Sequence, residues 1–310
     1  VKVWAEKDKR VWRPLSRYEI QFAADGTVEY RILPEGEKAH GEIWYAYLMT
    51  DACTGWYNGY TYIDAMNPDA VDKFIETTHD AYKREVGGDF GDTVPAIFTD
   101  EPNFGWFHRK RFARDGARVM IPWTQTFADT FRARYGYDIL EQLPQLIWNR
   151  ADGAPATARY HYIAHATERF AEAFSDRIGK WCDENGIAFT GHVLEEPTLL
   201  SQTRCVGEAM RQYRNFRLPG IDMLCNSVEL TTAKQAQSAV HQYGREGMLS
   251  ELYGVTGWEF DFRGHKFQGD WQAALGVTLR VPHLSWVSMK GSAKRDYPAS
   301  ISYQSSWYKE

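Results

Sequence analysis

Short apolar segments that end in acidic residues recur along this chain and constrain its fold most strongly. Residues 94–99 lead directly into Asp100-Glu101, and residues 187–194 lead into Glu195-Glu196. Residues 247–250 form a third such segment and lead into Glu251. Helix-length segments with apolar residues on one face lie between them, so the pattern predicts strands that alternate with helices of 12 or more residues. Such alternation is typical of parallel β/α units.

Six segments have the length and composition of strands. They are residues 43–49, 94–99, 187–194, 219–225, 247–250 and 278–287. Helices are expected at 67–86, 124–135, 138–148, 157–184, 231–243 and 270–276. The fold class is therefore expected to be α/β, a (β/α)8 TIM-type barrel. Six strands are two short of eight, which fits either a truncated chain with an incomplete barrel or further strands with weaker patterns.

The start of the chain has a different character. Residues 1–34 alternate charged and apolar residues around Ala24-Asp25-Gly26, which predicts a hairpin. We therefore expect a β-rich lead-in over residues 1–40 and a (β/α) barrel catalytic domain over residues 41–310. Because the chain has no initiating Met, it is expected to be part of a longer protein.

Composition excludes several classes of protein. The net charge of -5 gives no basic excess for a nucleic-acid surface. The sequence shows neither a signal peptide nor an apolar run of about 18 residues, so a cytoplasmic protein without membrane contact is expected.

The four cysteines have no CxxC spacing, which argues against a zinc or redox site. The 12 Trp and 18 Tyr residues suit contacts with sugar faces.

The acids at the predicted strand ends are candidates for catalysis. In β/α barrels the catalytic groups lie where strands end, because the loops there surround a concave mouth. Glycoside hydrolysis ordinarily needs two carboxyl groups, one to protonate the leaving oxygen and one to act on water or on the sugar. We expect Glu101 as the general acid and Glu251 as the general base, with Glu195 or Glu196 as the substitute for either.

Further side chains near the predicted strand ends are candidates for substrate binding. They are Asp100, His192, Tyr253, Trp258, Trp271, His283 and Trp286. No metal ligands are assigned, and the sequence requires no cofactor. P-loop, GxGxxG, HExxH and GxSxG motifs are absent from the sequence, so nucleotide-binding, zinc-protease and serine-hydrolase functions lack their signatures.

Four strings of residues resemble a known group of proteins. They are residues 98–102, 191–196, 249–257 and 294–300, and together they resemble large uncharacterised bacterial glycosyl hydrolases. That group is similar to the α-L-rhamnosidases of glycoside hydrolase family 106. The resemblance implies an inverting hydrolase with a barrel domain, accessory β-sandwich domains, an oligosaccharide or glycoside substrate and possible calcium.

The resemblance also implies roles for two residues. Glu101 follows Asp100, just as the acid of the rhamnosidases follows an aspartate. In the rhamnosidases the acid lies further from that aspartate, at the position where this chain has Asn103. Glu251 matches the later glutamate that activates water. Two other functions stay open: a non-catalytic carbohydrate-binding barrel, and a metal-dependent sugar isomerase or lyase that uses His192 with Asp100 and Glu195.

Overall fold

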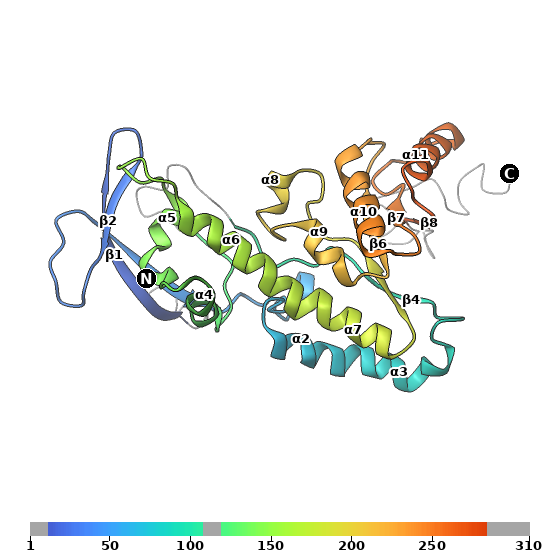
Figure 1. Cartoon of the computed structure of the whole chain (residues 1–310), viewed down its shortest axis with the longest axis horizontal. Coiled ribbons are helices and arrows are strands. Elements are labelled where there is room, and N and C mark those ends of the chain that lie inside the picture. The colour runs from blue at the N-terminus through green and yellow to red at the C-terminus, as the bar shows by residue number, and fades with distance from the viewer. Residues whose placement is uncertain (1–11, 108–118, 284–310) are drawn as a thin grey trace. The chain divides into compact units, whose positions relative to one another are not determined.

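A three-stranded antiparallel sheet and a five-stranded parallel sheet organise the computed structural model, which describes residues 12–107 and 119–283 (Figure 1). The sheets belong to two compact units. Unit 1 comprises residues 1–71 and 104–169, and unit 2 comprises residues 72–103 and 170–310. Each unit therefore draws on two separate parts of the sequence. The predicted lead-in over residues 1–40 falls within unit 1, and the predicted boundary at residue 40 stays a prediction.

The antiparallel sheet of unit 1 has the strand order β2-β1-β3, with β1 at Trp12–Phe22, β2 at Val28–Ile32 and β3 at Glu42–Met49. The predicted hairpin is confirmed: β1 and β2 pair antiparallel around a turn in which Gly26 has a φ of 82°. The Asp25 carboxylate accepts the Thr27 N–H at 2.9 Å and so closes that turn.

The segment 43–49 forms a strand, but its predicted place as the first barrel strand is wrong. It is β3, and it pairs antiparallel with β1, with Tyr18 opposite Trp44. Strand β1, which supplies the backbone hydrogen bonds to β3, is closer to β3 in the sequence than any strand of the parallel sheet is. An apolar run of this length predicts a strand but gives no information about its partner, and none of the residues of β3 is fully buried.

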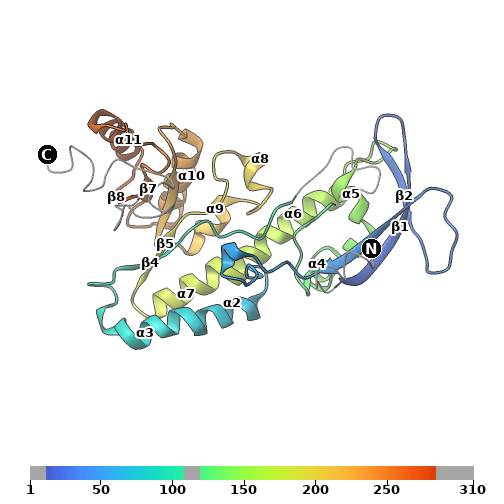
Figure 2. The same ribbon diagram turned by 180° about the vertical axis from the view of Figure 1, so that it is seen from behind.

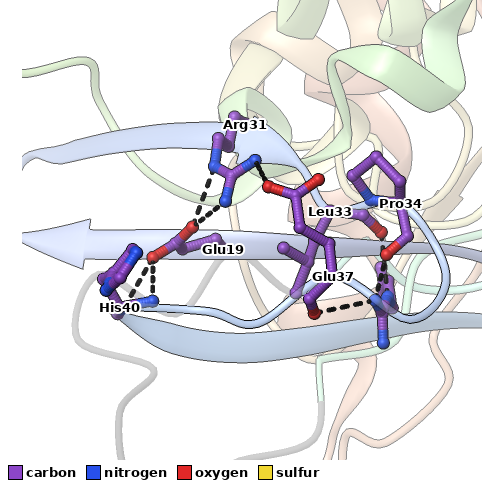
Figure 3. A network of polar contacts seen from close by, with 8 residues as sticks. Glu19, Arg31, Leu33, Pro34, Glu37 and His40 are labelled. Atoms are coloured by element: carbon purple, nitrogen blue, oxygen red, sulfur yellow. Dashed lines mark hydrogen bonds and ion pairs between the residues drawn. The ribbon is translucent and has the colours of Figure 1, made fainter.

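A buried carboxylate ties the loop after β2 to the antiparallel sheet (Figure 3). Glu19 is 4% exposed, and its Oε1 accepts the backbone N–H groups of His40 at 2.5 Å and Gly41 at 2.6 Å. Its Oε2 accepts from Arg31 at 2.8 Å, and Arg31 also pairs with Glu37 at 2.5 Å. The His40 N–H is the main cause that lowers the pKa of Glu19, and Arg31 adds to it. The charge is therefore compensated by donors where it is buried.

The helices of unit 1 enclose an aromatic core. They are α4 at Phe127–Tyr135, the 3-10 helix η4 at Ile139–Glu141, α5 at Leu143–Ile147 and α6 at Thr157–Phe170. The rings of Phe127 and Tyr162 are fully buried with centroids 5.2 Å apart. The Tyr162 hydroxyl donates to the Pro122 carbonyl, so its polar atom is satisfied inside the core. The helices predicted at 124–135 and 138–148 are thereby confirmed.

Two predicted helices contain π-helical stretches. Residues 67–86 contain α2 at Pro68–Phe74, η2 at Ile75–His79 and α3 at Asp80–Val86. Residues 157–184 contain α6, η5 at Ala171–Ser175 and α7 at Asp176–Glu184. The helical periodicity therefore located both segments, but it did not reveal the wider turns at η2 and η5.

The parallel sheet of unit 2 is a curled half-barrel, seen from two sides in Figures 1 and 2. Its strands in order are β4 at Ala96–Thr99, β5 at Ala188–Gly191, β6 at Leu218–Met223, β7 at Leu249–Leu252 and β8 at Leu279–Pro282. Five of the six predicted strands thus lie in one parallel sheet. The α/β class is confirmed, and a closed eight-stranded barrel stays a prediction.

Helices precede the strands of unit 2. Helix α7 packs against β5. Helix α10, at Leu230–Tyr243, packs against β6, and helix α11, at Phe262–Ala274, leads into β8. Helix α11 begins eight residues before the predicted start at 270, where the Asp261 side chain caps it by accepting the Gly264 N–H. The short elements α8 at Leu199–Gln202, α9 at Ala209–Gln212, η1 at Gly55–Tyr57, η3 at Gly87–Asp89 and η6 at Tyr213–Asn215 were not predicted. Within the described residues no helix is both long and apolar enough to cross a membrane.

Two glycines allow neighbouring strands of the parallel sheet to approach closely. A Cβ atom on Gly191 would lie 2.0 Å from the Thr99 carbonyl oxygen, and the φ of Gly191 is +123°. A Cβ atom on Gly220 would lie 2.3 Å from the Gly191 carbonyl oxygen. Side chains are thus excluded at the two points where β4, β5 and β6 are closest.

We expect Gly191→Ala to destabilise the protein by about 3 kcal/mol or more, because the new methyl group overlaps backbone and the φ is unfavourable for alanine. Gly88→Ala is the matched control, since Gly88 has open space around its Cα. Urea unfolding monitored by circular dichroism measures both changes. Equal midpoints for the two variants would contradict the close approach of β4 and β5.

Candidate active site

The carboxyl ends of four adjacent parallel strands bring titratable side chains together. Asp100 directly follows β4 and His192 directly follows β5, and Thr99 lies beside Gly191 in the register. Asp222 of β6 lies beside Glu251 of β7. Because the strands are parallel and in this register, their ends meet at one edge of the sheet. This edge is where active sites of β/α folds are found.

His192 is the central contact of this cluster. Its Nε2 lies 2.8 Å from Glu251 Oε2 and 3.6 Å from Asp100 Oδ1. The His192 side chain is 1% exposed, the Glu251 side chain 17% and the Asp100 side chain 73%. The three groups therefore run from the interior to solvent, and only the two carboxylates are accessible to a substrate.

His192 and Glu251 stabilise each other's charged forms. Burial opposes a charge on His192, but the hydrogen bond to Glu251 and the nearby Glu196 and Asp222 raise the pKa of His192 to about 9. Burial also opposes the charge on Glu251, yet the hydrogen bond and charge of His192 bring the pKa of Glu251 below its usual value. Glu251 is consequently ionised at neutral pH and hydrogen-bonded in a defined orientation.

Glu101 has the opposite electrostatic environment. Partial desolvation is the main cause that raises the pKa of Glu101, and the charges of Asp100, Glu251 and Glu195 add to it. The residue as a whole stays exposed to solvent. Two carboxyl groups of one site are thus shifted in opposite directions, which is the pattern expected for an acid and a base.

Three of the predicted site residues have left-handed backbone conformations. Glu101, Glu195 and Tyr253 have φ values of 46°, 61° and 78° and follow the ends of β4, β5 and β7. Positive φ is uncommon for residues with a Cβ and is concentrated at functional sites. The left-handed positions therefore lie within four residues of the ends of β4, β5 and β7.

The neighbours Glu195 and Glu196 have different environments. Glu196 is 3% exposed, and its carboxylate accepts from the Tyr213 hydroxyl at 2.6 Å and from the Asp222 N–H at 3.0 Å. Burial is the main cause that raises the pKa of Glu196 to about 7. Glu195 is half-buried and its carbonyl accepts from Ser201. Of the pair, Glu195 is the one that solvent reaches.

Asp222 belongs to the cluster and was not among the predicted site residues. Its Oδ1 is buried and has no hydrogen-bond partner within the described part of the chain. Burial is the main cause that raises the pKa of Asp222 to about 8. An aspartate inside the apolar segment 219–225 was the available signal, because an acid within a buried strand requires compensation.

We expect Asp222 to make the protein less stable as the pH rises from about 4 to about 8. The folded pKa of about 8 lies above the unfolded value of 3.8, so the folded state holds a proton that the unfolded state releases in this range. Asp222→Asn should reduce this fall. Urea midpoints of both proteins at pH 5 and pH 8 measure it, and an undiminished fall in the variant would contradict the assignment.

The predicted substrate-binding residues are distributed around this cluster and beyond it. The His283 ring lies over Gly254, where a Cβ would be 3.1 Å from the ring, and its charge helps to lower the pKa of Glu251. Tyr253 is buried, with its ring centroid 4.6 Å from that of His265. Trp258 is 43% exposed in the loop after β7.

Of the two remaining tryptophans, the structure describes only Trp271. Trp271 lies on α11 in a shallow surface depression with Lys266 and Phe267, and its Nε1 donates to Gln268 at 3.0 Å. Trp286 lies outside the described residues. Roles of both side chains in substrate binding stay predictions.

The cluster offers three ligand atoms to a metal ion but does not suit calcium. One atom each of Asp100, His192 and Glu251 lies within 4.8 Å of the others. Calcium takes six to eight oxygen ligands, whereas this set includes an imidazole nitrogen. The Nδ1 of His192 also has no hydrogen-bond partner among the described residues, although a metal-bound histidine usually donates its second N–H to one. No step of the chemistry below is assigned to calcium.

Comparisons with known proteins give a likeness to solved structures but no family match. No family model matches the sequence, and no curated protein matches it significantly. The solved structure of a rhamnosidase from Novosphingobium sp. PP1Y is similar with a TM-score of 0.55 and 21% identity. The match covers 73% of this chain and 21% of that chain, so this chain spans about a fifth of that protein. At this identity the likeness shows a shared fold.

Proposed function

We propose that this chain carries the catalytic centre of a glycoside hydrolase, with Glu101 as general acid and Glu251 as general base. The observation that supports it most is the opposite shift in pKa of these two carboxyl groups at one edge of the parallel sheet. The fold shared with a rhamnosidase and the resemblance in the sequence favour α-L-rhamnosides as the first substrates to test.

The proposed reaction uses Glu101 in its protonated form, which its raised pKa favours, and Glu251 in its ionised form, which its lowered pKa favours. Glu101, protonated, donates its proton to the glycosidic oxygen as the bond from that oxygen to the anomeric carbon breaks. Glu251, ionised, accepts a proton from a water molecule whose oxygen attacks the same carbon from the opposite face. The products are a free sugar of inverted configuration and the released alcohol. His192 holds the Glu251 carboxylate in place through its hydrogen bond.

A hydrolysis screen tests the proposal. The full-length protein is incubated with a panel of aryl glycosides that includes the α-L-rhamnoside, and proton NMR identifies the anomer that is released first. Release of one sugar in the inverted configuration would support both the class and the mechanism. A retained configuration would reject Glu251 as a base that acts through water, and failure to cleave any glycoside of the panel would count against the class.

The Asp100–His192–Glu251 set also favours one alternative, a metal-dependent sugar isomerase or lyase. A divalent transition metal accepts carboxylate and imidazole ligands together, which calcium does not prefer. The three ligand atoms that lie within 4.8 Å of one another belong to Asp100, His192 and Glu251, whereas the sequence suggests Glu195 as the third ligand. Metal analysis after dialysis separates the two functions: stoichiometric metal that is lost in His192→Ala would favour the alternative.

A non-catalytic carbohydrate-binding barrel is the remaining alternative from the sequence. It would bind sugars without cleaving any glycoside, and Glu101→Gln and Glu251→Gln would leave the affinity for sugar unchanged. Binding of a glycoside whose concentration stays constant over many hours would favour it over the hydrolase.

A further inference from the structure

Unit 1 contains a cavity of about 1160 Å³ that shares no residue with the carboxylate cluster of unit 2. Its walls come from strands β1 and β3, from residues 61–67, 104–106 and 119–125, and from helix α5. Binding pockets for small molecules usually measure about 300–1,000 Å³. The cavity is therefore large enough for a ligand of several sugar units.

Aromatic rings form much of the wall. Tyr45 is 51% exposed and stacks on Tyr47 with the ring centroids 6.2 Å apart and the planes 27° apart. Trp106 is 40% exposed on the segment that follows β4 in sequence. The buried Trp148 packs edge-on against Trp44 at 4.8 Å, and both residues also line the cavity. Exposed flat rings in a concave surface suit the C–H faces of sugars.

Polar groups lie among the rings, and their charges restrict the ligand. The wall contains three carboxylates, those of Glu42, Asp51 and Asp64. Among the described residues that line it, Arg13 is the one basic side chain. Glu42 accepts from the Trp44 indole at 3.3 Å, and Asp64 accepts from Thr124 at 2.7 Å. This excess of negative charge disfavours acidic sugars, and an entirely apolar ligand would desolvate the carboxylates without compensation.

We propose that this cavity binds a neutral oligosaccharide as a non-catalytic carbohydrate site. Tyr45 and Trp106 stack on sugar rings, and the carboxylates accept hydrogen bonds from sugar hydroxyl groups. The proposal goes beyond the proposed hydrolase activity, because the residues that carry it lie in unit 1 and take no part in bond cleavage. A ligand held here would retain a polymeric substrate or product on the enzyme.

Isothermal titration calorimetry on the full-length Glu251→Gln protein tests the site, since this variant is expected not to degrade the probes. The probes are cellohexaose, xylohexaose and mannohexaose, with hexagalacturonate as the anionic comparison. We expect at least one neutral hexasaccharide to bind, and Tyr45→Ala or Trp106→Ala to weaken its binding about tenfold. Tyr45→Phe should retain the affinity, because the ring is kept.

Matched controls lie in the same unit. Tyr60 is 73% exposed and Trp56 is 84% exposed, and neither lines the cavity. Tyr60→Ala and Trp56→Ala should therefore leave the affinity unchanged. Circular dichroism confirms that each variant is folded before it is titrated.

Three results would overturn the inference. They are no binding of any neutral hexasaccharide, binding that Tyr45→Ala and Trp106→Ala leave unchanged, and tighter binding of hexagalacturonate than of the neutral probes. The outcome is independent of the hydrolase proposal. A protein that cleaves aryl glycosides but fails these titrations retains the hydrolase function alone, and the reverse result retains the carbohydrate site alone.

Discussion

Glu251→Gln is expected to lower kcat by about 10²–10⁴-fold on every glycoside that the enzyme cleaves, the usual contribution of a general base. The amide is nearly the same size as the carboxylate and still accepts from His192, so the geometry of the site is kept. It cannot take a proton from water. KM should change little, because the missing interaction acts in the transition state.

Glu246→Gln is the matched control for this substitution. Glu246 is an exposed glutamate that precedes β7 in sequence and does not belong to the cluster. Steady-state kinetics on the preferred aryl glycoside compares the two variants. Activity of Glu251→Gln within twofold of the control would exclude Glu251 as the base and direct attention to Glu195.

Glu101→Gln is expected to give the second-largest effect, and the effect should depend on the leaving group. A glycoside with a poorly acidic alcohol needs protonation as its bond breaks, so its kcat should fall by about 10²–10⁴-fold. The nitrophenolate of a nitrophenyl glycoside leaves without being protonated. Glu101→Gln should therefore cleave such a glycoside at a rate close to that of the unmodified enzyme. A series of aryl glycosides with different phenol pKa values measures the change in slope.

The pH profile gives an independent test of Glu101. The pKa of Glu101 is raised, chiefly by desolvation, so the active protonated form is lost as the pH rises through that pKa. The pKa of Glu251 is lowered by His192, so the active ionised form is lost only at acidic pH. Activity should be bell-shaped, and Glu101→Gln should remove the alkaline limb. If Glu195→Gln removes that limb instead, Glu195 is the acid.

Much of the fold was predictable from local patterns. Apolar periodicity predicts the five segments that form the parallel sheet and the helices that precede β5 and β7, but only the second half of the helix that precedes β8. Glu101 and Glu251 are predicted as candidates because they directly follow or occupy short apolar strands, and their roles stay predictions. Such features depend on residues that are close together in the sequence. A helix or strand that packs on one face shows apolar residues at regular spacing, and a short strand that packs on both faces shows a continuous apolar run.

The relation between Glu195 and Glu196 was not predictable in the same way. Adjacent acids in the sequence carry equal signals, and only the position of Tyr213 and of the Asp222 N–H shows that Glu196 is the buried one. Asp222 itself was missed because an acid inside an apolar run does not reveal whether its side chain faces other acids. Its register partner Glu251 lies 29 positions later in the sequence numbering.

The sequence by itself determined most of the segments that become strands and helices, the left-handed turn at Gly26 and the presence of acids at strand ends. Only the tertiary structure decided that β3 pairs with β1, that His192 joins Asp100 and Glu251, and that the aromatic residues of unit 1 enclose a cavity. The physical reason is range: periodicity and turn chemistry act between neighbouring residues, whereas strand register, ion pairing and cavity walls depend on contacts between residues far apart in the chain.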